Sequence, residues 1–169
     1  MAEPALKGER TSTETSSKAH APNRVRYEDD LYGWVEEQVS LLRAGAVDSL
    51  DLQNIAEELS DVGAAQYHRL ESVLRVLLMH MLKWDQQPEM RTPSWIYSIV
   101  EQRRRYERLL SKNPGLKSSL DEIRDDIYPI ARNWAADETH LPADEFPDTC
   151  PYSWDDILRR PFDFDSVKK

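Results

Sequence analysis

The chain has 169 residues, of which 40% are hydrophobic and 31% are charged, and its formal net charge is −9 at pH 7. This length suits one domain of ordinary size and excludes two large ones, and the composition is that of a folded protein rather than a chain disordered throughout. The excess of acid opposes general binding to nucleic acid or to an anionic membrane, because both are polyanions.

The cysteine content and the lack of long apolar segments indicate the cellular compartment of the protein. Cys150 is the only cysteine, so no intrachain disulfide can form, and a reducing cytoplasm is the simplest setting. The first 25 residues contain no apolar signal segment, and no run approaches the roughly 18 apolar residues that a membrane span requires. We therefore predict a soluble cytoplasmic protein with no membrane partner.

The chain divides into three predicted segments. Residues 1–25 are rich in Ser, Thr, Lys and Glu and poor in large apolar residues, so they are predicted to be a disordered arm. Residues 26–160 are predicted to form the helical domain, and residues 161–169 a loosely ordered tail. The first helix is expected to begin near Tyr27 and to stop at Gly45, because glycine readily adopts the left-handed conformation that ends a helix.

A long helical segment follows, from about Asp51 to Gln86. Asp51 is a suitable N-cap, and the spacing of three and four between apolar residues predicts a helix with a wide apolar face. Gly63 interrupts the pattern, so a bend or a brief break is expected there. A helix with so wide an apolar face is normally central, with neighbours on more than one side.

Three further helices are predicted. One begins at Thr92-Pro93 and ends at Asn113-Pro114-Gly115, and the next runs from about Leu116 to Trp134, with a kink expected at the internal Pro129. The acidic stretch 137–149 is expected to be irregular. Ser153 and Asp156 form the pattern of a capping box before a last short helix. The fold class is therefore all-α, a single-domain bundle of about four to six helices around one long segment.

Several short strings in this order resemble a known family, that of the bacterial domain of unknown function 29. The resemblance covers roughly Tyr27 to Leu158, and it implies a helical bacterial protein with no established activity. The strings are Tyr27–Trp34, Leu41–Gly45, Leu50–Leu59, Leu70–Arg75, His80 with Leu82–Trp84, Gln87-Pro88, Ser94-Trp95, Glu101–Arg103, Glu138-Thr139 and Cys150–Tyr152.

Carboxylates on the long segment are the first candidate for chemistry. Glu57, Glu58 and Glu71, with His80, are residue types that hold divalent metals in helical bundles, which would suit a metal-assisted hydrolase or nuclease. The Glu-x-x-His order of di-iron bundles is missing, however. A solvated acidic face is the simpler interpretation, and no motif assigns a cofactor.

The end of the long helix and the start of the next helix carry the second candidate. Two helices joined by a short turn run side by side, which would bring a cation, an imidazole and aromatic rings together in a binding pocket. The alternative is a set of packed boundary residues, which is the commoner setting for such a histidine. The candidate pocket residues are His80, Lys83, Trp84, Gln87, Trp95 and Arg103.

The arginine-rich run Arg103–Arg108 is the third candidate. It could contact phosphates of a nucleic acid, or an acidic protein partner, whereas an exposed helix face paired with neighbouring acids is the simpler interpretation. No complete catalytic set or nucleotide-binding motif is present, so the enzyme question stays open. We therefore predict a protein-interaction or adaptor module that binds a protein partner or a second copy of itself. The aromatic residues expected to be exposed are Tyr27, Tyr32, Trp34, Tyr152 and Trp154.

Overall fold

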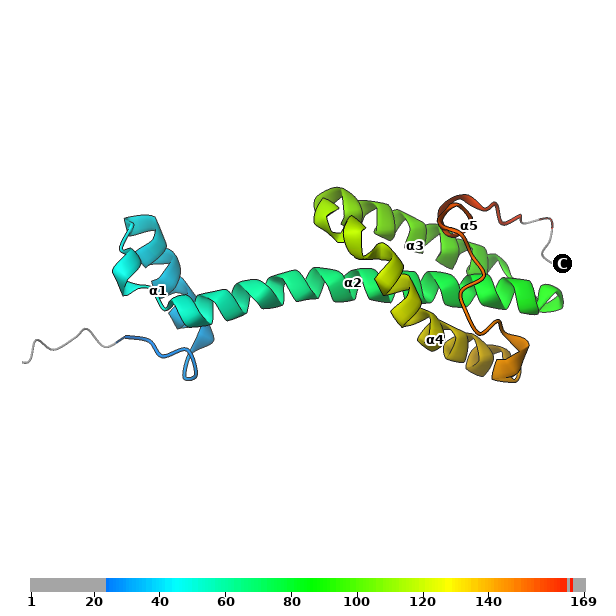
Figure 1. Ribbon diagram of the computed structural model, residues 1–169, viewed down its shortest axis with the longest axis horizontal. Coiled ribbons are helices and arrows are strands. Elements are labelled where there is room, and N and C mark those ends of the chain that lie inside the picture. Colours follow the sequence, from blue (N-terminus) through cyan, green and yellow to red (C-terminus); the bar gives the residue numbers. More distant parts are fainter. Residues whose placement is uncertain (1–23, 164, 166–169) are drawn as a thin grey trace, which may run out of the picture. The chain divides into compact units, whose positions relative to one another are not determined.

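A computed structural model describes residues 24–163 and 165. These residues form α1 (Leu31–Ala44), α2 (Leu52–Gln86), α3 (Pro93–Lys112), α4 (Leu120–Thr139) and α5 (Trp154–Arg159), with short 3₁₀ turns between them and no strand (Figure 1). The prediction of an all-α fold with one long helix is confirmed. Residues 1–23 of the predicted disordered arm lie outside the described residues. Residues 164 and 166–169 of the predicted tail also lie outside them.

The chain divides into two compact units, and the boundary between them falls within α2, after Ile55. In the first unit, α1 begins at Leu31 rather than near Tyr27. The carboxylate of Asp30 accepts a hydrogen bond from the Gly33 amide at 2.9 Å and thereby caps the helix. Gly45 ends α1 in the left-handed conformation with φ of 70°, as its position predicts.

The interior of the first unit is small. Within residues 24–55, the buried residues are Trp34 and Gln38, so the expectation that Trp34 is exposed is wrong. The Trp34 indole donates to the Asp51 carboxylate at 3.3 Å, and the Asp51 amide donates to the side-chain oxygen of Gln38 at 2.9 Å. Asp51 also accepts from the Asn54 amide at 3.3 Å, which confirms its predicted role as the N-cap of α2.

The long helix α2 passes through Gly63 without interruption, so of the two expectations at this residue, a bend or a brief break, the break is wrong. A glycine inside a helix costs only about 0.5–1 kcal/mol relative to alanine, which the flanking helical turns offset. From Leu70 onward, the apolar face of α2 is buried in the core of the second unit, where α3 and α4 lie along it (Figure 1). No helix in the described part of the chain has the length and apolarity needed to cross a membrane.

The later helices follow most of the predicted signals, with differences at the ends of α3 and α4. α3 begins at Pro93 as expected, but Thr92 makes no capping hydrogen bond to the helix backbone. α4 begins at Leu120 rather than near Leu116, because residues 114–119 form a 3₁₀ helix. It includes Pro129 and continues to Thr139, five residues past the expected end at Trp134. α5 begins with the predicted capping box, in which the Ser153 hydroxyl accepts from the Asp156 amide at 3.1 Å.

Candidate functional site

Lys83 is the centre of the predicted polar cluster in the second unit. The residue is only 5% exposed, although it carries a charged group. Its ammonium forms an ion pair with Glu138 of α4 and lies 4.5 Å from the centroid of the Trp95 ring of α3. A buried charge is tolerated only when it is paired, and the ring face adds a favourable cation–π contact. This single side chain therefore links α2, α3 and α4.

His80 lies one helical turn before Lys83 and is partly buried. Burial, and after it the positive charge of Lys83, lowers the pKa of His80 from its usual 6.5 to about 4, against an opposing effect of Glu138. Its Nδ1 is buried and makes no hydrogen bond. The imidazole is therefore neutral near pH 7, and a group with this pKa is a poor general acid or base at that pH.

Trp84 and Gln87 complete the end of α2. The Gln87 side-chain amide donates to the Thr139 carbonyl at 2.8 Å, which satisfies an acceptor at the last turn of α4. Trp84 is buried, and the Arg91 guanidinium lies 4.6 Å from its ring centroid while donating to the Trp84 carbonyl at 2.9 Å. Each of these contacts ties one helix end to a neighbouring segment.

Arg103 has a different role from the arginines that follow it. Its guanidinium donates three hydrogen bonds, of 2.8 to 3.0 Å, to carbonyls around the end of α5. The last carbonyls of a helix have no partner within the helix, so Arg103 caps α5. The accepting carbonyls are those of Asp156, Ile157 and Arg160. Arg104, Arg105 and Arg108 are exposed.

A second, partly buried polar group lies near this end of α2 and was not predicted as part of the site. Asp85 forms an ion pair through both oxygens with the Arg160 guanidinium, at 2.6 and 2.8 Å, and accepts from the Tyr152 hydroxyl at 2.8 Å. Tyr152 is buried, which corrects the expectation that it is exposed. Burial, and after it the charge of Asp85, raises the pKa of Tyr152. In the sequence, the only indication that Asp85 belongs to this site is its position beside Trp84. Its partners Tyr152 and Arg160 are 67 and 75 residues away along the chain.

The six predicted pocket residues therefore fall into two groups. His80, Lys83 and Trp95 share one environment, whereas Arg103 is bonded to the end of α5. Trp84 and Gln87 extend the first group toward Arg91 and the end of α4. Through these contacts we infer that the cluster joins α2 to α3 and α4, and α3 to α5. Its role as a ligand pocket stays a prediction.

The predicted carboxylate set on α2 is not brought together as a metal centre. Within residues 24–163 and 165, no group of three or more His, Cys, Asp or Glu side chains is arranged to hold a metal ion. Of the three candidates, Glu57 is exposed and Glu58 partly exposed, while the Glu71 carboxylate contacts His68 Nδ1 at 2.7 Å. The half-buried Cys150 thiol has a pKa raised by burial, which opposes thiolate formation at neutral pH.

These observations define an all-α protein in which buried and partly buried charged and aromatic side chains join its helices. The family model described as domain of unknown function DUF29 matches residues 26–163, so the chain belongs to this family. The comparison with curated proteins and the comparison with solved structures each gave no match. The family description names no activity or ligand, so a function has to be sought in the chain's own residues.

Proposed function

We propose that the protein is an interaction module whose α2 binds a basic amphipathic helix of a partner protein. The observation that carries the proposal is the exposure of residues 56–69 of α2, none of which is buried. This stretch includes Leu59 and Val62, which are 66% and 60% exposed. Two large aliphatic side chains one turn apart on an uncovered helix are an anchor of the kind that helix-binding surfaces use.

The apolar spacing of this stretch supports a helical partner. Apolar residues recur at intervals of three and four at Leu52, Ile55, Leu59 and Val62, which is the spacing that pairs one helix with another. After an interval from Gly63 to Arg69, the same spacing resumes at Leu70, Val73 and Leu77, where the side chains are buried in the core of the second unit. A face built in the same way as the core face is thus left uncovered along residues 56–69.

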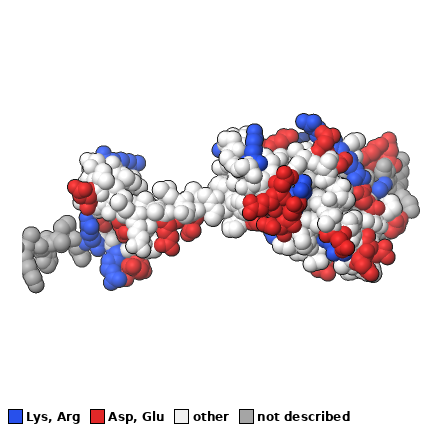
Figure 2. Space-filling model, in the orientation of Figure 1, with Lys and Arg blue, Asp and Glu red and all other residues white. Residues whose placement is uncertain are grey.

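Charge indicates which kind of helix would fit. The sequence has no Lys or Arg between Arg43 and Arg69, whereas it has five acids there, at Asp48, Asp51, Glu57, Glu58 and Asp61. Figure 2 shows uncharged and acidic atoms along this part of α2. A second copy would bring like charges together, while a partner rich in Lys or Arg would bring opposite charges together. The charge pattern therefore favours a basic partner over self-association.

The first unit supports the proposal independently. Its described residues bury only Trp34 and Gln38, although Leu31, Leu42 and Val47 are large apolar residues that lie exposed. A unit with so few buried apolar contacts has little stability of its own, and such units are typical of surfaces that become ordered on binding.

The test uses two model helical peptides, each about three heptads long, with the same leucine positions. One carries lysine and the other glutamate at the remaining exposed positions. The full chain is expected to bind the lysine peptide and not the glutamate peptide, with affinity that falls as salt rises. The combined change Glu57→Gln and Asp61→Asn should weaken this binding and reduce its dependence on salt.

Apolar variants decide whether the binding uses this face. Leu59→Gln with Val62→Gln should weaken binding of the lysine peptide by about tenfold or more, because two aliphatic anchors are lost. Met90→Gln is the matched control, since Met90 is 57% exposed but lies outside α2. Equal binding of both peptides, or an equal loss in the control, would refute the proposal. A dimer in sedimentation that dissociates in the Leu59 and Val62 variant would show instead that a second copy covers the face.

A further inference from the structure

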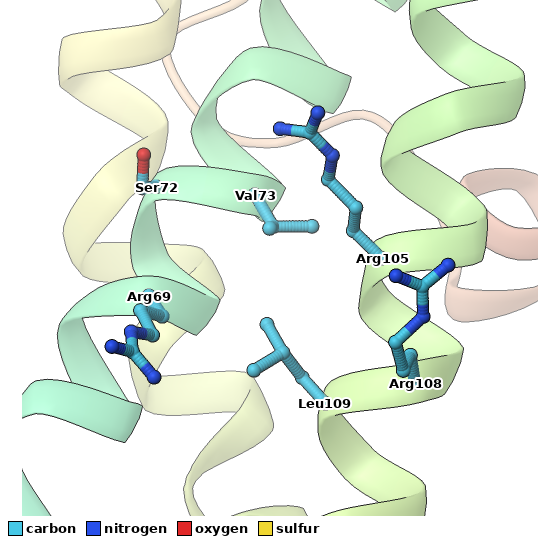
Figure 3. Close-up of a pocket in the computed structure, with 6 residues that line it drawn as sticks. All are labelled: Arg69, Ser72, Val73, Arg105, Arg108 and Leu109. Atoms are coloured by element: carbon cyan, nitrogen blue, oxygen red, sulfur yellow. The ribbon is translucent and has the colours of Figure 1, made fainter.

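A cavity of about 340 Å³ lies between α2 and α3, away from the cluster around Lys83. Three of its lining residues come from α2 and three from α3, and Figure 3 shows Val73 and Leu109 pointing toward one another between the surrounding arginines. The volume falls within the range of about 300–1,000 Å³ that is usual for small-molecule sites. The lining residues are Arg69, Ser72, Val73, Arg105, Arg108 and Leu109.

The lining carries three guanidinium groups and no carboxylate. Among the bonds that these groups make, Arg69 Nη1 donates to the Gln66 side chain at 3.3 Å, and Arg105 Nε donates to Glu101 at 2.8 Å. Each guanidinium has five N–H donors, so one such bond leaves most of its donor capacity for a ligand. The Ser72 hydroxyl adds a donor or acceptor at the rim.

From this arrangement we propose that the α2–α3 cavity binds a small phosphate-bearing molecule with an apolar body. A planar carboxylate is satisfied by one arginine through two parallel hydrogen bonds, whereas a phosphate presents three oxygens and up to two charges to several donors. Arginines from two helices border the same hollow and match the second case, although their guanidinium groups do not point at one another in Figure 3 and would turn toward a bound phosphate. Val73 and Leu109 provide apolar contact for the rest of the molecule.

The surroundings distinguish this ligand from a nucleic acid. A nucleic acid requires an extended basic surface that follows its backbone, because most of its affinity comes from many phosphate contacts. Here Arg103 is bonded to the end of α5, and the exposed Arg104 lines a different cavity, so the arginines of α3 do not form one continuous basic surface. A single phosphate group is the anion that matches the extent of the cavity.

The experiment measures binding of phenyl phosphate, inorganic phosphate and benzoate to the full chain by calorimetry. Phenyl phosphate is expected to bind most tightly, inorganic phosphate more weakly because it lacks the apolar body, and benzoate weakest. Arg69→Gln and Arg108→Gln should each weaken phenyl phosphate binding by about tenfold, the scale of one lost hydrogen bond to a charged group. Arg104→Gln is the matched control, because Arg104 is an exposed arginine of α3 that lines a different cavity with Ile96 and Tyr97.

Two results would overturn the proposal. One is the absence of phenyl phosphate binding, or binding that Arg69→Gln and Arg108→Gln leave unchanged while the thermal unfolding of these variants matches that of the original chain. The other is tighter binding of a single-stranded oligonucleotide, lost equally in Arg104→Gln, which would assign the arginine face to nucleic acid. Arg69 belongs to both regions, but the peptide-binding residues Leu59 and Val62 do not line this cavity. Arg108→Gln lies on α3 and therefore tests the phosphate proposal separately from the peptide proposal.

Discussion

Two consecutive stretches of α2 carry the same kind of apolar pattern and have different environments. Residues 70–86 bury Leu70, Leu74 and Leu77 completely, because α3 and α4 lie along them. Residues 56–69 contain no buried residue, although Leu59 and Val62 stand at equivalent spacings. Periodicity thus determines which face of a helix is apolar, but only the neighbouring elements determine whether that face becomes core.

The largest predicted difference between the two stretches concerns their leucines. Leu77→Ala should lower the free energy of unfolding by about 2–5 kcal/mol, because it leaves a cavity in a fully buried site. Leu59→Ala removes an exposed side chain and should change it by no more than about 0.5 kcal/mol. Urea unfolding followed by circular dichroism measures both values. Similar losses in the two variants would show that residues 56–69 are covered in solution.

The next effect tests the buried charge at the end of the covered stretch. Glu138→Gln leaves Lys83 buried without its ionic partner and should cost about 1–3 kcal/mol, reduced from the value of a fully buried pair because Glu138 is half exposed. Lys83→Met removes the charge itself and should cost less. Asp155→Asn is the control, because both side chains of the Asp155–Arg159 pair are more than 70% exposed. If Lys83→Met lowers the free energy of unfolding more than Glu138→Gln does, the result would contradict this expectation. It would mean that the ion pair stabilises the fold by more than the cost of burying the Lys83 charge.

The third effect concerns pH and His80 in the covered stretch. The pKa of His80 is about 4 in the folded chain and about 6.5 when unfolded, so the unfolded state binds more protons between these values. The resulting stability is fully present above pH 6.5 and is lost as pH falls toward 4. With partial solvent exposure taken into account, the loss should be about 2 kcal/mol.

His80→Gln should remove this part of the pH dependence, because glutamine does not titrate. Urea unfolding of the original chain and the variant at pH 7.0, 5.5 and 4.5 gives the comparison. The difference in unfolding free energy between the two proteins should change by about 2 kcal/mol across this range. Parallel pH profiles would mean that burial and Lys83 do not hold the imidazole neutral.

The sequence was sufficient for several helix ends because these depend on local chemistry. Asp51, Pro93 and the Ser153 capping box each act within one helical turn, so their effect can be read without knowledge of the fold. The expected break at Gly63 is wrong for a related reason: the local cost of one glycine is smaller than the stability of a helix anchored further along the chain.

The candidate site was only partly predictable. His80, Lys83 and Trp84 are near one another in the sequence and in space. Glu138, however, is 55 residues away from its partner Lys83, and Arg160 is 75 residues away from its partner Asp85. Periodicity carries no information about such pairs. The arginine run shows the same limit, because consecutive residues of a helix point about 100° apart. Arg103 therefore turns to the end of α5 while Arg104 and Arg105 are exposed.

The smallest predicted effect isolates the backbone of the uncovered stretch. Gly63 lies inside α2, and a Cβ added there would meet no atom within 4 Å. Gly63→Ala should therefore stabilise the protein by about 0.5–1 kcal/mol, because alanine restricts the unfolded chain and favours the helix. Gly45 has equally open surroundings but a φ of +70°, so Gly45→Ala should be destabilising by about 1 kcal/mol. Thermal unfolding of both variants, with hydrogen exchange of α2 amides, measures the contrast. If Gly63→Ala is neutral while exchange along residues 56–69 stays as slow as in residues 70–86, the uncovered turns are already held as firmly as the core.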